Sequence, residues 1–169
     1  MKKWGTNIKL IITSNVRRLI SIVKEIMMPK AKDLMTKTVI TVKKNTPIYG
    51  ALEFMVEQNI TGVPVVDDDM TLVGILSEKD VLRLFPAGKD KREMVVDDFM
   101  TQPAVHFDED EDLQDVCDCL MNNYFRRVPI TSKKKLVGII SRRDIIDHIL
   151  QTIHQNTDSN RPDKLVTTG

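Results

Sequence analysis

Two short stretches of the chain repeat the same order of apolar and polar residues. Residues 72–80 read LVGILSEKD, and residues 136–144 read LVGIISRRD. In each, an apolar run with the length of a buried strand ends in a serine, and an aspartate follows three residues later. Serine and an acid at this spacing predict the start of a helix. Free backbone N–H groups and a hydroxyl at such a helix start can meet an anion, and the carboxylate lies one turn further on.

The same residues, Ser77 with Asp80 and Ser141 with Asp144, also have a purely structural interpretation. A serine at the N-cap and an acid three residues later form a capping box, which satisfies backbone N–H groups at a helix start. For the serines the two interpretations are compatible, because a capping hydroxyl can also face a cleft. The aspartates discriminate better, because glutamate would serve the cap as well, yet both copies carry aspartate.

Both stretches belong to a longer internal repeat. Residues 33–36 (DLMT) match residues 98–101 (DFMT), and VPV at 63–65 matches VPI at 128–130, both at an offset of 65. A repeat of about 60 residues with so few strands cannot bury a good core alone. Two copies in tandem are therefore expected to pack sheet to sheet and share a core.

Each copy predicts the order strand, helix, strand, strand, helix. Short apolar runs indicate the strands, and apolar residues at helical spacing indicate the helices. The expected strands are 39–42, 63–66 and 72–76 in the first copy and 104–107, 128–131 and 136–140 in the second; the expected helices are about 47–58, 78–85, 112–123 and 142–151.

The chain divides into five parts by composition. They are an N-terminal extension (1–30), a first repeat (31–86), a charged linker (87–96), a second repeat (97–152) and a polar C-terminal tail (153–169) that is expected to be disordered. The extension holds seven basic residues and one acid, so it carries +6, and the rest of the chain carries −5 of the net +1. Apolar residues at every third or fourth position between 8 and 26 predict a basic amphipathic helix.

Three interpretations of this basic extension stay open. It can pack on the repeats or on a second subunit, be loosely ordered, or lie on an anionic membrane surface through residues 8–28. Nonspecific contact with nucleic acid is a weaker alternative, because the chain has few aromatic residues and its folded part is mildly acidic. Met28 is a second candidate for the start of translation.

The residues offer little support for an enzyme or a membrane span. The three histidines, His106, His148 and His154, are scattered, with no acid or nucleophile at catalytic or metal-binding spacing. No apolar run approaches the roughly 18 residues that would span a bilayer. Two cysteines, Cys117 and Cys119, form no disulfide framework and suit a reducing cytoplasm. We therefore expect a cytoplasmic protein that is not an enzyme and holds no metal site.

In its paired motifs the chain resembles a tandem pair of cystathionine-β-synthase (CBS) domains of the stand-alone bacterial type. The resemblance rests on DLMT and DFMT, on GVPVVD and RVPIT, and on the two LVGIxSxxD motifs, and it covers residues 33–150. It implies an α+β fold of two β-α-β-β-α units related by pseudo-two-fold symmetry, and a homodimer. It also implies a regulatory role: sensing AMP, ADP, ATP or S-adenosylmethionine in clefts between the units, with an effector protein that no motif identifies. The alternative is an interaction or scaffold protein that senses no ligand. No cofactor is required, and Mg²⁺ is an optional companion of the phosphates.

The resemblance also assigns roles to individual residues. Asp80 and Asp144 would accept hydrogen bonds from the two ribose hydroxyls, a geometry that one carboxylate can satisfy. Ser77 and Ser141 would contact ribose or phosphate. The adenine slots would be formed by Thr38, Val39 and Ile40 with Val63 and Pro64, and by Pro103, Ala104 and Val105 with Val128 and Pro129. Thr36 and Thr101 could add hydroxyl contacts or cap a turn, and ordinary core packing remains the alternative for each apolar residue.

Phosphate recognition should depend on the basic residues that distinguish the copies. Thr61-Gly62 in the first copy becomes Arg126-Arg127 in the second, and Glu78-Lys79 becomes Arg142-Arg143. A planar guanidinium suits phosphate oxygens, so Arg126, Arg127 and Arg142 are the main candidates and Lys79 a weaker one. Solvated surface charge is the alternative, and it must hold for at least one of each Arg pair. The two clefts are therefore expected to be unequal, and the SRRD copy is the first place to expect a phosphate.

Overall fold

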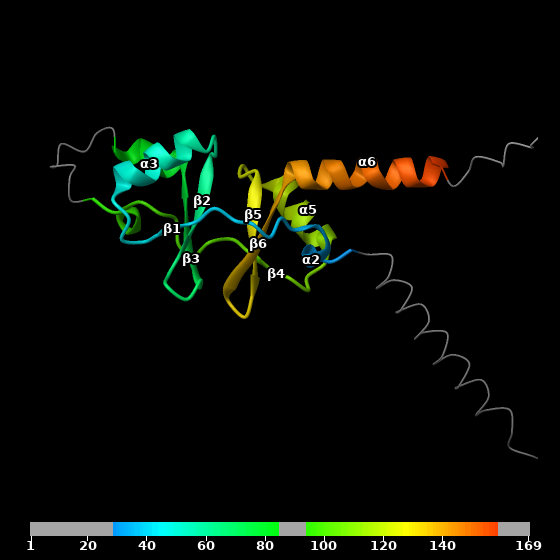
Figure 1. Ribbon diagram of the computed structural model, residues 1–169, viewed down its shortest axis with the longest axis horizontal. Coiled ribbons are helices and arrows are strands. Elements are labelled where there is room, and N and C mark those ends of the chain that lie inside the picture. Colours follow the sequence, from blue (N-terminus) through cyan, green and yellow to red (C-terminus); the bar gives the residue numbers. More distant parts are fainter. Residues whose placement is uncertain (1–28, 85–93, 159–169) are drawn as a thin grey trace, which may run out of the picture.

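The structure is a computed structural model that describes residues 29–84 and 94–158. Two three-stranded sheets stand side by side in the middle of the molecule, and the helices cover their outer sides (Figure 1). The predicted α+β fold of two repeats is confirmed. The predicted N-terminal amphipathic helix, most of the linker and the end of the tail lie outside the described residues.

The first repeat forms a sheet in the order β1-β2-β3, with β1 parallel to β2 and β2 antiparallel to β3. Its elements are β1 (Val42–Lys43), α3 (Ile48–Glu57), β2 (Gly62–Val66), β3 (Leu72–Ser77), α4 (Glu78–Val81) and the 3-10 turn η1 (Leu82–Leu84). The β2 strand is almost fully buried, as its continuous apolar run predicted.

The second repeat has the same topology, with the sheet order β4-β5-β6. Its elements are β4 (Phe107–Asp108), α5 (Leu113–Asn122), β5 (Arg127–Ser132), β6 (Lys135–Ser141) and α6 (Arg142–Asp158). The α6 helix extends away from the sheets (Figure 1). It reaches Asp158, seven residues beyond the predicted end, so the expectation of a disordered tail from 153 onward was wrong for residues 153–158.

The first strand of each repeat is shorter and lies later than predicted. Of the expected strands 39–42 and 104–107, only Val42 and Phe107 are in the sheet, and each strand continues one residue further, to Lys43 and Asp108. The residues before them leave the sheet, because they run toward the other repeat. Thr38, Val39 and Ile40 border a cavity there instead of pairing with β2.

Each repeat begins with a segment that packs on the other repeat. We call residues 31–36 and 96–101 the leading segments; they contain α2 (Ala31–Leu34) and the 3-10 turn η3 (Val96–Asp98). The first is paired with β6 through Thr36 and Ile139, whose N–H groups each donate to the other's carbonyl at 3.0 Å. The second is paired with β3 in the same way, through Ile75 and Thr101.

This exchange completes both hydrophobic cores. Val96, Phe99 and Met100 from the second leading segment belong to the core of the first repeat. Ala31, with Leu34 and Met35 packed beside it, belongs to the core of the second. The expectation of one shared core was therefore wrong: there are two cores, and each contains apolar side chains from both sequence repeats, because one repeat is too small to bury a core alone.

The glycine in each LVGI motif allows this crossing. A Cβ on Gly74 would lie 2.9 Å from the Thr101 carbonyl oxygen, and a Cβ on Gly138 would lie 2.7 Å from Met35 Cγ. Both approaches are too close for any side chain. Gly74 of β3 thus leaves space for Met100, and Gly138 of β6 leaves space for Met35. This contact explains why the glycine motif and the methionine motif occur together in each repeat.

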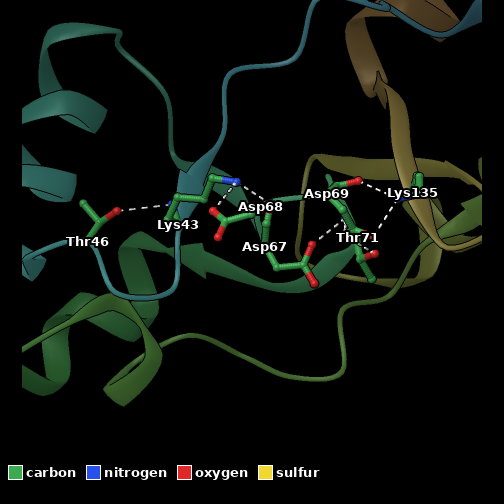
Figure 2. A network of polar contacts seen from close by, with 7 residues as sticks. All are labelled: Lys43, Thr46, Asp67, Asp68, Asp69, Thr71 and Lys135. Atoms are coloured by element: carbon green, nitrogen blue, oxygen red, sulfur yellow. Dashed lines mark hydrogen bonds and ion pairs between the residues drawn. The ribbon is translucent and has the colours of Figure 1, made fainter.

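The β2–β3 and β5–β6 turns contact each other at one end of the molecule (Figure 2). Lys135 Nζ donates to the backbone oxygen and to Oδ2 of Asp69, both at 2.7 Å. Hydrogen bonding to the Asp67 carboxyl group, to Lys135 and to Thr71 holds the pKa of Asp69 well below its usual range. Backbone bonds from Leu72 to Lys134 and from Leu136 to Met70 add to this contact. The turns therefore join the two repeats directly.

None of the helices within 29–84 and 94–158 is both long and apolar enough to span a membrane.

Candidate functional site

Two cavities lie between the repeats, at the opposite end of the strands from the joined turns. The larger, which we call the Asp80 cavity, has a volume of about 510 Å³. The smaller, the Asp144 cavity, has a volume of about 230 Å³. Ligand pockets for drug-sized molecules commonly measure about 300–1,000 Å³. The Asp80 cavity is within that range, and the Asp144 cavity is smaller.

Each cavity combines residues of both repeats. In the Asp80 cavity, Ser77 and Asp80 from the end of β3 and the start of α4 face Thr101, Ala104 and Val105 of the second repeat. In the Asp144 cavity, Ser141 and Asp144 face Thr36, Thr38, Val39 and Ile40 of the first repeat. The residues of the expected first strands, 38–40 and 104–105, therefore border the Ser–Asp pair of the opposite copy. The exchange of leading segments explains this, because residues 38–40 and 104–105 directly follow the crossing.

Asp80 is 3% exposed, and both its carboxylate oxygens accept hydrogen bonds. Oδ2 accepts from the backbone N–H of Ser77 at 2.9 Å and from its hydroxyl at 2.5 Å. Oδ1 accepts from the Thr101 hydroxyl at 3.0 Å, and Arg83 lies 3.7 Å away. The capping box is present, and Asp80 also joins the two repeats. A ribose could bind Asp80 only by displacing or sharing the Thr101 hydroxyl.

Asp144 has a more open arrangement. Its Oδ2 accepts from the Ser141 N–H at 2.7 Å and from the Ser141 hydroxyl at 2.6 Å, so the capping box is present here too. Its Oδ1 accepts no hydrogen bond from any described residue. Thr36, the counterpart of Thr101, lines the same cavity without such a bond to Asp144. The half-buried Asp144 carboxylate thus keeps one oxygen available for a ligand.

The basic residues gather around the Asp80 cavity. Lys79, Arg126 and Arg127 line it, and Arg127 also lines the Asp144 cavity. Arg142 lines neither, because its guanidinium donates to the carbonyl oxygens of Leu120, at 2.8 and 3.1 Å, and Asn123, at 2.7 Å. It holds the C-terminal end of α5. Arg126 of the second repeat therefore faces only the Ser–Asp pair of the first repeat, whereas Arg127 borders both that pair and the SRRD corner.

Most of the candidate residues border one cavity or the other. Those in the Asp80 cavity are Val63, Pro64, Ser77, Lys79, Asp80, Thr101, Ala104, Val105, Arg126, Arg127 and Pro129. Those in the Asp144 cavity are Thr38, Val39, Ile40, Pro64, Arg127, Ser141 and Asp144. Pro103, Val128 and Arg142 line neither, and Val128 is part of the second core.

The sequence reasoning missed several residues of the Asp80 cavity. Asn123, Tyr124 and Phe125 form its edge between α5 and β5, and the Tyr124 side chain is fully exposed. At the offset of 65 the first repeat has Asn59 and Ile60 in place of Tyr124 and Phe125. Comparing the copies position by position, as was done for the arginines, would have pointed to these aromatic residues. A flat ring there can stack on a base.

The walls between the sheets are apolar. Pro64 and Ile139 border both cavities, and Ile75 and Pro129 border the Asp80 cavity. Within the described residues, no group of three or more His, Cys, Asp or Glu side chains is placed to hold a metal ion. The site thus offers apolar surfaces, with Glu78 and Asp80 as the acids of the larger cavity, Asp144 as the acid of the smaller one, and cations mainly in the larger.

Fold and site together define a pair of intertwined repeats with two cavities between them. The family model of the CBS domain matches the chain twice, over residues 31–87 and 96–151. The chain belongs to the CBS-domain family, and its two matches make it a CBS pair.

Named relatives support this assignment. The protein MJ1225 of Methanocaldococcus jannaschii is 33% identical over 142 residues, which are 84% of this chain and 49% of that protein. The chain therefore spans about half the length of this relative.

Solved structures are similar in both fold and sequence. CBSX2 of Arabidopsis thaliana, solved in complex with AMP, is 34% identical with a TM-score of 0.65 over 73% of this chain and 98% of that chain. The CBS pair of MJ0100, solved with 5′-methylthioadenosine and S-adenosyl-L-methionine, is 25% identical with a TM-score of 0.61 over 74% and 98%.

Proposed function

We propose that this chain is a regulatory sensor that binds an adenine nucleotide or a related adenosyl ligand between its two repeats. The observation that carries the proposal is that each cavity pairs a Ser-x-x-Asp corner of one repeat with the segment after the crossing in the other. Relatives of the same fold bind AMP, 5′-methylthioadenosine and S-adenosyl-L-methionine. The proposed role is binding and signalling, without catalysis.

The ligand would act by shifting a population of arrangements. A molecule in either cavity touches both repeats, so its binding energy depends on how the repeats are placed relative to each other. A ligand favours the arrangement that it contacts better, by no more than its difference in affinity. The joined turns at the far end limit sliding there, so the freedom that remains is a change of angle around the cavities (Figure 2).

The two cavities favour different ligand charges. Lys79, Arg126 and Arg127 suit the Asp80 cavity to a phosphate-bearing nucleotide, and its volume leaves room for more than one phosphate. The Asp144 cavity is smaller, and Arg127 is the one cation that the described residues place beside Asp144, so this cavity suits AMP or an uncharged adenosyl ligand. We also propose a cytoplasmic homodimer as the working form, with an effector protein still to be identified. Mg²⁺ would accompany only a di- or triphosphate.

The test is isothermal titration of the full chain with AMP, ATP and S-adenosylmethionine, with ATP titrated both with and without Mg²⁺. The Asp144→Asn variant should weaken binding in the Asp144 cavity by about 10- to 100-fold, because hydrogen bonds to a charged group contribute about 1.5–3 kcal/mol. Binding in the Asp80 cavity should remain. Ligand binding should also raise the melting temperature, by mass action.

Asp118→Asn is the matched control. Asp118 lies on α5, away from both cavities, and pairs with Gln114. It should leave every affinity unchanged. Absence of heat and of any melting shift with all three ligands would rule out the sensor function. Salt-sensitive binding to nucleic acid in the same protein would then favour that alternative.

A further inference from the structure

One cationic side chain is shared by the two cavities. Arg127 begins β5 and lines both the Asp80 and the Asp144 cavity. Gly62, Pro64 and Ile139 also border both, but none of them carries a charge. Among the residues that the structure describes, Arg127 is the only charged group common to the two cavities.

Only one of the two repeats supplies such a shared cation. Gly62 occupies in the first repeat the position that Arg127 occupies in the second, at the offset of 65. A Cβ at Gly62 would meet its nearest neighbour, the Leu76 carbonyl oxygen, at an ordinary 3.5 Å. A side chain would therefore begin without a clash there. The site between the cavities holds one guanidinium where a symmetric pair would hold two.

Arg127 is not committed to any protein partner. Its side chain makes no hydrogen bond or ion pair with the described residues, and its Nε is buried without an acceptor. Arg142 is the opposite case, with its guanidinium held by the Leu120 and Asn123 carbonyl oxygens. A buried N–H without an acceptor is unfavourable. An anion in either cavity can supply the missing acceptor if the side chain turns toward it.

The two cavities depend on Arg127 to different degrees. A phosphate in the Asp80 cavity has Lys79 and Arg126 nearby besides Arg127, so three cations offset the two acids that line this cavity, Glu78 and Asp80. A phosphate in the Asp144 cavity has Arg127 as its only cation among the described residues, and it faces the Asp144 carboxylate. The Asp144 cavity therefore loses more of its affinity for a phosphate when the Arg127 guanidinium turns away.

We propose that Arg127 makes the two cavities antagonistic toward anionic ligands. This inference rests on the proposed nucleotide binding and adds a rule for it. When a phosphate in one cavity draws the guanidinium, the other cavity loses its shared cation and faces an additional negative charge nearby. The second anionic ligand should then bind about tenfold more weakly, within the usual range of coupling between sites. A ligand without phosphate escapes this penalty.

The test measures the coupling with one blocked cavity at a time. Val105 lines only the Asp80 cavity, and its counterpart Ile40 lines only the Asp144 cavity; both are partly exposed. Val105→Trp and Ile40→Trp each fill one cavity, so AMP titration of each variant gives the affinity of the other cavity alone. The coupling factor is the product of these two association constants divided by the product of the two stepwise constants of the unblocked protein.

The factor should be about 10 in the wild-type chain and close to 1 in an Arg127→Met background. Arg126→Met is the matched control: it should weaken the Asp80 cavity and leave the factor near 10, because Arg126 lines only that cavity. Arg127→Lys, which keeps the charge, should retain a factor well above 1. Adenosine, which has no phosphate, should give a factor near 1 in every variant. Circular dichroism checks that each variant is folded.

The outcomes separate this inference from the function beneath it. No AMP binding to the wild-type chain overturns both. Two-site binding with a factor of 1, or a factor that survives Arg127→Met, overturns only the antagonism. If the wild-type chain binds one AMP while both blocked variants bind one each, the antagonism is stronger than proposed and is supported. If only the Ile40→Trp variant binds, there is a single nucleotide site and the antagonism is wrong.

Discussion

Gly138 lies where the first leading segment crosses β6, and of the four described glycines it leaves the least room for an added methyl group. An alanine Cβ there would approach Met35 Cβ to 2.8 Å and Met35 Cγ to 2.7 Å. Overpacking of this kind usually lowers stability by about 1–3 kcal/mol. We expect Gly138→Ala to lower the free energy of unfolding by that amount in urea denaturation.

Gly50→Ala provides the control for this prediction. Gly50 lies within α3, and a Cβ there would meet nothing within 4 Å. Alanine should therefore stabilise the chain by about 0.5–1 kcal/mol through helix propensity. Equal effects of the two substitutions would contradict the close crossing at Gly138.

At the scale of single residues, the sequence predicted which residues belong to the site better than it predicted which partners they contact. Ser77, Asp80, Ser141 and Asp144 could be found from the repeated motif, and both their capping role and their place beside a cavity agree with the two interpretations of that motif. The commitment of Arg142 to the end of α5 could not be found, because its partners are backbone carbonyls whose position depends on tertiary packing.

At the scale of elements, the contact between the two turns gives stability that depends on pH. The pKa of Asp69 is lowered in the folded protein, so folding favours its charged form. The contribution is therefore present above the ordinary aspartate pKa of about 3.9 and is lost as the pH falls through the lower folded value. Asp69→Asn should be less stable than wild type at pH 7, and the difference should shrink below about pH 4.

Urea unfolding at neutral and acidic pH measures this difference. Asp68→Asn is the control from the same turn, because the Asp68 side chain is fully exposed and its nearest cation, Lys43, lies 3.4 Å away. It should change stability less than Asp69→Asn does. A gap between Asp69→Asn and wild type that stays constant with pH would show that Asp69 does not link stability to protonation.

The element order was predictable from sequence, but the bounds of the first strands were not. The hairpins and the helices α3 and α5 follow the apolar periodicity closely. Residues 38–40 have the composition of a strand, yet they leave the sheet to reach the other repeat. Apolar periodicity indicates that one face of a segment is buried, but it does not indicate which repeat covers that face.

At the scale of the whole molecule, α6 presents an apolar stripe that suits the proposed homodimer. Ile146, Ile149 and Leu150 lie on one helical face, and each is about half exposed. We expect Ile149→Glu to convert the dimer into monomers, because a charge at this position cannot be buried without a partner. Sedimentation velocity over a range of concentrations measures the change.

Gln151→Glu is the matched control, since it adds the same charge at an exposed neighbouring position of α6. It should leave the dimer intact. A wild-type chain that is monomeric, or an Ile149→Glu variant that remains dimeric, would exclude this helix as the dimer contact.

The pairing of the repeats is the part of the molecule that the sequence could not predict. Two copies carry the same leading segment and the same glycine, so either segment could cross either strand without changing any pattern. The structure selects the exchanged pairing, and Arg126 and Arg127 of the second copy consequently line the cavity that contains Asp80 of the first. Symmetric motifs therefore located the site residues while leaving open which of them meet.

The exchange of leading segments also determines the order in which the two cores can fold during synthesis on the ribosome. All buried residues of the first core come from one span of the chain, from Val42 to Met100. The second core needs Ala31 from the beginning and Ile140 from the end. The first can therefore close as soon as residue 101 has left the exit tunnel, whereas the second must wait for the last strand. Until then the 31–36 segment has no partner to pack on, and the first core folds while the second is still incomplete.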